Sequence, residues 1–181
     1  MLTTGRGQAQ GFGGAVASPH VLTSIAAMEV LSRGGNAVDA AIAANAVQGT
    51  VAPETCGIGG DLFALVWKPG ASAPEALNAS GWAGSKVSAE SMRDDGHTSI
   101  PNDHPVSVSI PGAVAGWFAL ADRFGTSSVG SLLARAIHHA IEGFAASDEF
   151  SRATDGRRVD LQLSESGLEL LGGSEAAGTG D

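Results

Sequence analysis

A stretch of almost uniformly small and apolar side chains, residues 37–48, constrains this chain more than any other feature of its sequence. Asn36 precedes the stretch and Asp39 stands three residues later, which is the spacing of a helix capping box. We therefore predict a helix over residues 37–48. Alanine recurs along it, at Ala40, Ala41, Ala43, Ala44 and Ala46. A helix with so few large side chains allows other elements to approach it closely on several sides.

Another helix is predicted just before this one, over residues 22–33. Three of its apolar side chains recur at helical spacing: Ile25, Met28 and Leu31. The pair Gly34–Gly35 follows directly. Glycine readily takes the left-handed backbone conformation that ends a helix, so this pair marks the end of the first helix.

Two β-strands are predicted after a glycine-rich turn at residues 56–60. The first, residues 61–68, is almost continuously apolar, and we expect it to be covered on both faces, with Trp67 in the core. The second, residues 75–78, follows the turn at Pro69–Gly70. Two strands give at most a hairpin-sized sheet, which is marginal alone, so further strands are expected elsewhere. The chain by itself should therefore expose an apolar sheet edge and self-associate.

The second half of the chain contains two more predicted helices. Residues 81–105 are expected to be irregular, with at most one helical turn, before Pro111–Gly112 opens a helix. A further helix is predicted over residues 129–142. Its apolar side consists of Leu132, Leu133, Ala136, Ile137 and Ala140. Beyond Ser147 the core pattern fades, and the leucines between 161 and 171 are expected to form one amphipathic segment.

Composition and charge argue against several classes of partner. Hydrophobic residues make up 43% of the chain and charged residues 16%, so a sizeable core can form. The net charge of −9 disfavours binding to nucleic acid or to an anionic membrane surface. The single cysteine, Cys56, excludes an intrachain disulfide, and the five histidines lack metal-ligand spacing, so no metal is expected. No apolar run approaches the length of a membrane-spanning helix.

The first ten residues show no charged-then-apolar signal pattern. We therefore expect a cytoplasmic protein. A signal segment upstream of the given start would make it periplasmic or secreted instead.

Four stretches of the chain, taken together, resemble the γ-glutamyltransferase family. They are Ala17–His20 with Glu29–Ala41, which contains the run GGNAVDAA; Val51–Phe63, which contains GIGG; Ile110–Trp117, which reads IPGAVAGW; and Leu133–Phe144. Their order and spacing both agree with the family. The resemblance covers residues 11–147, and the order helix, helix, strand, strand, helix, helix suits layered α/β packing.

This resemblance implies an α/β (α+β) fold that is part of the four-layer αββα sandwich of N-terminal-nucleophile (Ntn) hydrolases. It also implies a precursor that cuts itself into a large and a small subunit. The catalytic threonine would begin the small subunit, and its α-amine would act as base during hydrolysis or transfer of γ-glutamyl or related amides, such as glutathione. No cofactor is implied. Residues 1–150 would form the N-terminal part of the large subunit, and residues 151–181 a poorly matched, disordered tail.

The residues that perform this chemistry are missing from the chain. Thr3–Thr4 lies at the wrong end and has no neighbouring histidine, and no other threonine has the right context. No residue of this chain is therefore assigned a catalytic role, and its partner would be the missing C-terminal segment or small subunit. The chain is then either a gene fragment of such an enzyme or a truncated, non-catalytic homologue that acts as a binding or assembly module.

A second departure concerns substrate binding. The family holds the substrate carboxylate with an arginine shortly after the second strand, whereas this chain reads Leu77–Gly84 as LNASGWAG. The position that matches arginine is Ser80 in one alignment and Trp82 in another. Neither supplies a bidentate cation. We name Ser80 and Trp82 as candidate substrate-binding residues and expect a preference for another amide or acyl group.

Simpler interpretations cover the other chemically suggestive residues. The run Gly57–Gly60 precedes a strand, whereas phosphate-binding loops follow one, so it is read as a structural turn. Asp39 is explained as a helix cap, and the role of Glu54 stays open. Cys56 has no basic neighbour in sequence and is read as an inert thiol. Trp117 is expected in the core.

Overall fold

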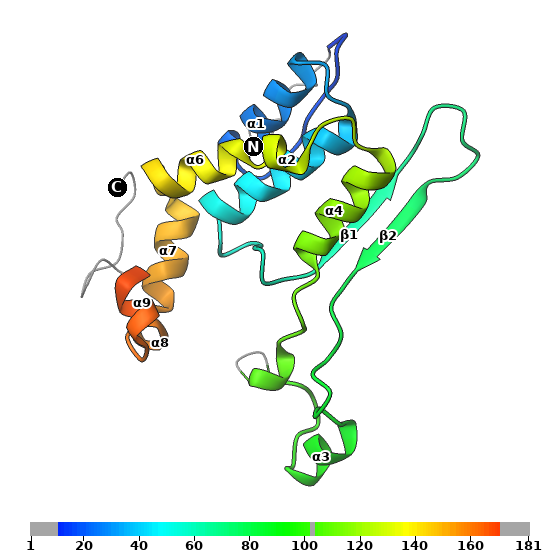
Figure 1. The fold of residues 1–181 in the computed structure, drawn as a ribbon. Coiled ribbons are helices and arrows are strands. Elements are labelled where there is room, and N and C mark those ends of the chain that lie inside the picture. Colours follow the sequence, from blue (N-terminus) through cyan, green and yellow to red (C-terminus); the bar gives the residue numbers. More distant parts are fainter. Residues whose placement is uncertain (1–10, 102–103, 171–181) are drawn as a thin grey trace, which may run out of the picture.

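The computed structural model describes residues 11–101 and 104–170 of the chain. Helix α1 (Val21–Ser32) packs against α2 (Ala37–Val51), and α4 (Ala113–Phe124) lies between α2 and a β-hairpin (Figure 1). The hairpin strands are β1 (Leu62–Val66) and β2 (Glu75–Ala79). The predicted order of these elements is confirmed. Expectations about the first ten residues, including Thr3–Thr4, and about residues 171–181 lie outside the described residues.

Local hydrogen bonds explain where α1 and α2 begin and end. The His20 side chain accepts from the Leu22 amide at the start of α1, and Gly34 ends that helix region with φ +89°. The predicted capping box is present, since Asn36 accepts from the Val38 and Asp39 amides while the Asp39 carboxylate accepts from the Asn36 amide. α2 extends three residues beyond the predicted end.

The core is centred on α2, which contacts α1, α4, α5 (Val129–Leu132) and α6 (Ala134–Glu142). Small side chains permit this, because neighbouring helices can approach α2 from several sides. The buried hydrophobic cluster contains Ala26, Val38, Ile42, Ala43, Ala46, Val47, Val51, Leu62, Ala113, Trp117, Leu120, Leu132 and Ala136. Trp117 is only 5% exposed, and its indole N–H donates to Asn45 Oδ1 at 2.7 Å, so its predicted core position is confirmed.

The hairpin is antiparallel, with Leu62 opposite Ala79 and Val66 opposite Glu75. Its inner face packs on α4. Gly116 makes this contact possible, because a Cβ at that position would lie 2.9 Å from the Ala79 Cβ. Two strands form the whole sheet within the described part of the chain, as predicted.

The outer face of the hairpin differs from expectation. Phe63 is 67% exposed, Leu65 75% and Trp67 64%. The predictions that this strand is covered on both faces and that Trp67 is a core residue are therefore wrong for this chain. The physical reason is that side chains alternate along a strand, and α4 covers only the face that carries Leu62 and Ala64. We call Phe63, Leu65 and Trp67 the outer sheet face.

The segment between β2 and α4 projects away from the helices (Figure 1). It contains α3 (Ala89–Asp94) and the 3₁₀ helix η1 (Pro105–Ser107). At most one helical turn was predicted here, and α3 is longer than that, with six residues. Neither element has a buried residue, so the described residues of this projection form no core of their own.

The helix predicted over residues 129–142 is divided into α5 and α6 at Leu133. The ψ angle of Leu133 is −9°, well away from the roughly −42° of a regular α-helix. This change turns the chain, so that Leu132 and Ala136 are buried while Ile137 is exposed. The expectation that Ile137 and Ala140 belong to the buried apolar side is therefore wrong, since both are exposed.

Three short helices follow Ser147: α7 (Asp148–Gly156), α8 (Arg158–Leu161) and α9 (Glu165–Leu170). Within the described residues, the single amphipathic segment expected between residues 161 and 171 is instead the end of α8, a turn and α9. Ser147 begins α7 by accepting from the Phe150 amide at 3.0 Å. Helical structure thus continues through residues 151–170, where a disordered tail was expected. The signal was a serine cap followed by two acidic residues, Asp148 and Glu149, which favour a helix N-terminus. Across the described ranges, no helix is both long and apolar enough to cross a membrane.

Candidate functional site

The two candidate substrate-binding residues follow β2, where three separate segments meet. These segments are residues 57–61 before β1, residues 79–82 after β2 and residues 109–113 before α4, and we call them together the neck. Asp61 Oδ1 accepts from the Gly81 amide at 2.9 Å and from the Ser109 hydroxyl at 2.9 Å. The neck therefore joins parts of the chain that are 20 and 48 residues apart.

Backbone hydrogen bonds complete the neck. The Ile110 amide donates to the Trp82 carbonyl at 2.9 Å, and the amides of Gly112 and Ala113 both donate to the Gly60 carbonyl at 3.0 Å. The Ser80 amide donates to Asn78 Oδ1 at 2.9 Å. These hydrogen bonds thus fix both chain segments at the base of the α3 projection, the one that enters it and the one that leaves it.

Two glycines allow the neck segments to approach so closely. A Cβ on Gly81 would lie 1.5 Å from the Ile110 carbonyl oxygen, and a Cβ on Gly112 would lie 2.1 Å from the Ala79 carbonyl oxygen. Any larger residue would separate the segments. Gly112, the first glycine of the sequence IPGAVAGW, therefore has a packing role, because it lets residues 79–82 lie against the start of α4.

The side chains of the two candidates differ in their surroundings. The Ser80 hydroxyl lies 3.4 Å from the Gly81 carbonyl oxygen and also interacts with the Asp61 carboxylate. The Trp82 ring is 84% exposed, as the loop prediction implied. The donors in the neck bonds described above are backbone amides and a serine hydroxyl. The bond from the Gly81 amide and that from the Ser109 hydroxyl hold the pKa of Asp61 below its ordinary value, so Asp61 carries a negative charge beside both candidates at neutral pH.

Asp39 has more partners than a helix cap requires. Burial raises the pKa of this carboxyl, but hydrogen bonds from Thr126, Asn36 and Ser127 outweigh that effect and lower it overall. The Thr126 amide lies 3.0 Å from Asp39 Oδ1 and the Ser127 amide 3.3 Å from it. The side chain is completely buried. Asp39 thus ties the start of α2 to the turn after α4, a structural role that sequence reasoning found only in part.

Glu54 and Cys56 lie in the connection between α2 and β1. Glu54 and Pro53 line one side of a cavity of about 530 Å³, and residues of α7 together with Arg157 line the other. Burial raises the pKa of the Cys56 thiol, which leaves less thiolate and agrees with an inert cysteine. In the described ranges, no group of three or more His, Cys, Asp or Glu side chains is arranged to hold a metal ion.

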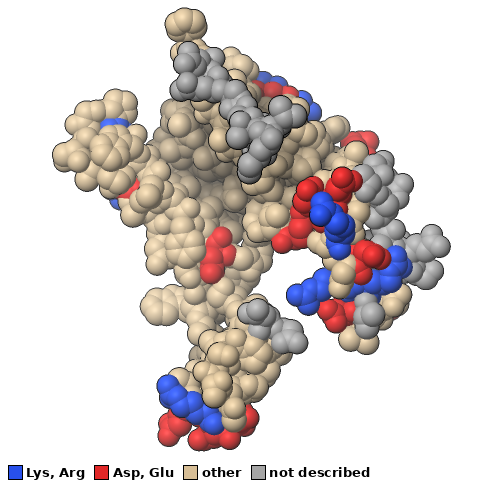
Figure 2. Space-filling model, turned by 180° about the vertical axis from the view of Figure 1, so that it is seen from behind, with Lys and Arg blue, Asp and Glu red and all other residues tan. Residues whose placement is uncertain are grey.

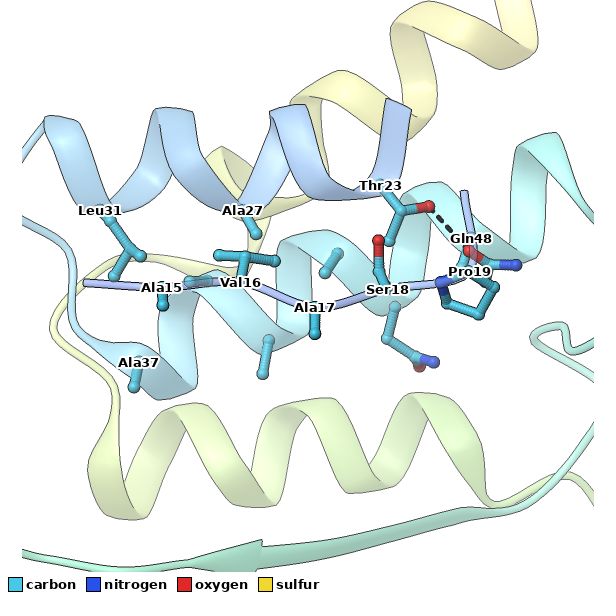
Figure 3. A pocket seen from close by; sticks show the side chains of 14 residues that line it. Ala15, Val16, Ala17, Ser18, Pro19, Thr23, Ala27, Leu31, Ala37 and Gln48 are labelled. Carbon is cyan, nitrogen blue, oxygen red and sulfur yellow. Dashed lines mark hydrogen bonds between the residues drawn. The ribbon is translucent and has the colours of Figure 1, made fainter. Parts of the chain in front are cut away.

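A second cavity, of about 390 Å³, lies where residues 15–19 cross α1 and α2 (Figure 3). Half of its lining residues are alanines, four of them from α2. Its polar end contains Thr23, whose hydroxyl donates to Gln48 Oε1 at 2.8 Å. No Lys, Arg, His, Asp, Glu or Cys is among the residues that line it. The cavity offers a packing surface with two hydroxyls, from Ser18 and Thr23, and no charged or titratable side chain.

Solved structures define the class of protein to which this fold belongs. The γ-glutamyltranspeptidase of Helicobacter pylori is 27% identical and superposes with a TM-score of 0.88, over 97% of this chain and 51% of that chain. The cephalosporin acylase of Bacillus halodurans gives a TM-score of 0.78 at 26% identity, over 96% of this chain and 36% of the other. The fold is thus part of the αββα sandwich of Ntn hydrolases.

Sequence comparison then identifies the family. The profile of the family named Gamma-glutamyltranspeptidase matches residues 23–171, and this chain belongs to that family. It is 35% identical to the glutathione hydrolase-like YwrD proenzyme of Bacillus subtilis, over 82% of this chain. It is also 35% identical to the oxamate amidohydrolase proenzyme of Klebsiella pneumoniae, again over 82% of this chain. The chain spans only 28% and 29% of those two relatives.

Proposed function

We propose that this chain is the N-terminal part of an Ntn hydrolase that cleaves amide bonds or transfers the acyl group. The observation that carries this proposal is the agreement along 97% of the chain with the H. pylori enzyme. Two relatives support the reaction class, because glutathione hydrolase and oxamate amidohydrolase are both named for substrates that contain an amide. The substrates that these two relatives are named for share an amide bond and differ in the acyl group.

In the proposed reaction, a threonine hydroxyl from the part of the family that this chain does not span attacks the amide carbonyl. The Thr–acyl ester forms as the C–N bond breaks, and the amine leaves with the proton taken up by the threonine α-amine. Water, or an acceptor amine, then takes the acyl group and restores the threonine. The contribution of this chain is to position the substrate and to support the fold.

We propose that Ser80 and Trp82 face the substrate at the neck. Trp82 offers an apolar surface on a fixed backbone, and Ser80 offers a hydroxyl. Asp61 adds a negative charge close by. Neither position supplies an arginine that could bind the carboxylate of a γ-glutamyl group. We therefore propose that this site prefers an amide substrate with a different acyl group.

The proposed partner is the remaining segment of the same enzyme, which would cover the outer sheet face. Three large apolar side chains are exposed there, and the sheet has only two strands in the part of the chain that the structure describes. Seen from behind, Lys, Arg, Asp and Glu gather around α7–α9 and on the α3 projection, while the surface between them is largely uncharged (Figure 2). An uncharged, apolar surface fits a sheet-to-sheet contact better than a charged partner.

A chimera tests the proposed function. Residues 11–170 would replace the matching part of the B. subtilis YwrD proenzyme, and the chain alone would serve as the control. We expect the chimera to cut itself into two subunits and to hydrolyse a γ-glutamyl anilide or oxamate, while the chain alone hydrolyses neither. Hydrolysis by the chain alone would overturn the proposal. A chimera that folds and assembles but neither cuts itself nor hydrolyses an amide would favour the binding or assembly module instead.

The candidate residues are tested in the same chimera. Trp82→Arg should strengthen binding of a γ-glutamyl compound, because the guanidinium can hold a carboxylate through two hydrogen bonds. Ser80→Arg tests the other alignment. A KM for the γ-glutamyl anilide that neither arginine changes would count against both positions.

A further inference from the structure

Trp82 combines two properties that are seldom found together. Its ring is 84% exposed, yet its backbone is held on both sides, by the bond from Ile110 to its carbonyl and by the bond from the Gly81 amide to Asp61. An exposed aromatic side chain on a fixed backbone loses little entropy when a ligand orders it. Large rigid aromatic residues of this kind often contribute most to binding.

Asp61 is the residue that fixes this backbone. It lies directly before β1, and the register that places Leu62 opposite Ala79 brings it alongside the residues that follow β2. One of its oxygens, Oδ1, accepts from Gly81 and from Ser109 at the same time. Hydrogen bonds to an ionised carboxylate are stronger than those between neutral groups. A single charged side chain therefore holds both chain segments at the base of the α3 projection, one through Gly81 and the other through Ser109.

We propose that Asp61 is a positioning residue for substrate recognition, acting by holding the Gly81–Trp82 backbone so that the Trp82 ring meets an apolar part of the amide substrate. This inference rests on the proposed function. Asp61 does not touch the reacting atoms in this account, and its effect passes through Trp82. There is no room for a side chain at position 81, where a Cβ would lie 1.5 Å from the Ile110 carbonyl oxygen. The Asp61 carboxylate instead binds the Gly81 backbone amide from a neighbouring segment.

The first experiment uses the chain as it is and measures order at the neck. Amide hydrogen exchange at Gly81 and Ile110, and ¹⁵N relaxation of the Trp82 amide, would be compared in wild type, Asp61→Ala, Asp61→Asn and the exposed control Asp122→Ala. We expect Asp61→Ala to speed exchange by about tenfold or more, since a bond to a charged group is lost. Asp61→Asn keeps an acceptor oxygen and should restore most of the protection. Unchanged exchange in Asp61→Ala would overturn the proposal.

The second experiment separates positioning from general structural support. In the chimera, Asp61→Ala should raise KM about tenfold with little change in kcat, and Trp82→Ala should do the same. In the double variant the two effects should not multiply, because Asp61 acts through Trp82. Effects that multiply fully would overturn the proposal. A chimera without activity would refute the proposed function, while the exchange measurement still decides the role of Asp61 at the neck.

Discussion

The helical core and the β-hairpin use the same kind of apolar sequence with opposite results. α2 is apolar on nearly all sides and is enclosed by α1, α4, α5 and α6. β1 is equally apolar, yet one of its faces is open to solvent. The difference shows that apolar character indicates a surface to be covered, while the covering layer has to be supplied by other elements. In this chain four helices, one before α2 and three from the second half of the chain, cover α2, whereas α4 alone covers β1.

The two tryptophans Trp117 and Trp67 give the sharpest test of this contrast. Trp117→Ala should lower the free energy of unfolding by about 3–5 kcal/mol, because it leaves a cavity in the core and an unpaired Asn45. Trp67→Ala, on the outer sheet face, should change it by less than about 0.5 kcal/mol. Urea denaturation followed by circular dichroism measures both. Equal losses would mean that the sheet face is covered in solution.

Asp39 tests how the helical core is held together. Asp39→Asn should lower the free energy of unfolding by about 2–3 kcal/mol. The charge-assisted hydrogen bonds would be lost, and the NH₂ group of asparagine would be placed next to another donor, the Thr126 amide. Thr126→Val, which removes the hydroxyl and keeps the shape, should cost less. Asp122→Asn, on the exposed side of α4, is the matched control. A neutral effect of Asp39→Asn would contradict the role of this buried carboxylate in joining α2 to the turn after α4.

An ion pair at the rim of the helical core should have a smaller effect. The Arg135 guanidinium holds the pKa of Glu29 below its ordinary value of 4.5. Glu29 therefore binds a proton more readily in the unfolded chain than in the folded one. The stabilisation by this ion pair is complete above the pKa of Glu29 in the unfolded chain, and it is lost as the pH falls through the pKa of Glu29 in the folded chain. Glu29→Gln should cost about 0.5 kcal/mol at neutral pH, since the pair is partly exposed. The cost should shrink as the pH falls below 4.5 and through the lower pKa of folded Glu29, and Glu90→Gln is the control.

The smallest change in stability is expected on the outer sheet face. Leu65→Lys should leave the free energy of unfolding of this chain within about 0.5 kcal/mol, and it should reduce self-association measured by sedimentation velocity. In the chimera the same substitution should hinder assembly, because the lysine would be buried against the added segment. A chimera that assembles normally with Leu65→Lys would show that the partner covers another surface.

The neck could be predicted only in part. The residues of IPGAVAGW and the run LNASGWAG both stood out in the sequence, and Ser80 and Trp82 were named from the second. The sequence shows that Asp61 is a polar residue between a glycine-rich turn and an apolar strand. It does not show that Asp61 joins the two runs, because the bonds concerned cross 20 and 48 residues. The bonds from Thr126 and Ser127 to Asp39 were missed for the same reason.

Local sequence by itself determined the capping box at Asn36, the end of α1 at Gly34 and the turn of the hairpin, because each depends on residues a few positions apart. Tertiary structure decided which apolar faces are covered, as in the contrast between Trp117 and Trp67. It also decided which carboxylates join distant segments, as Asp39 and Asp61 do. The physical reason is that burial and long-range hydrogen bonds depend on which elements meet in space, and the spacing of residues along the chain does not specify that.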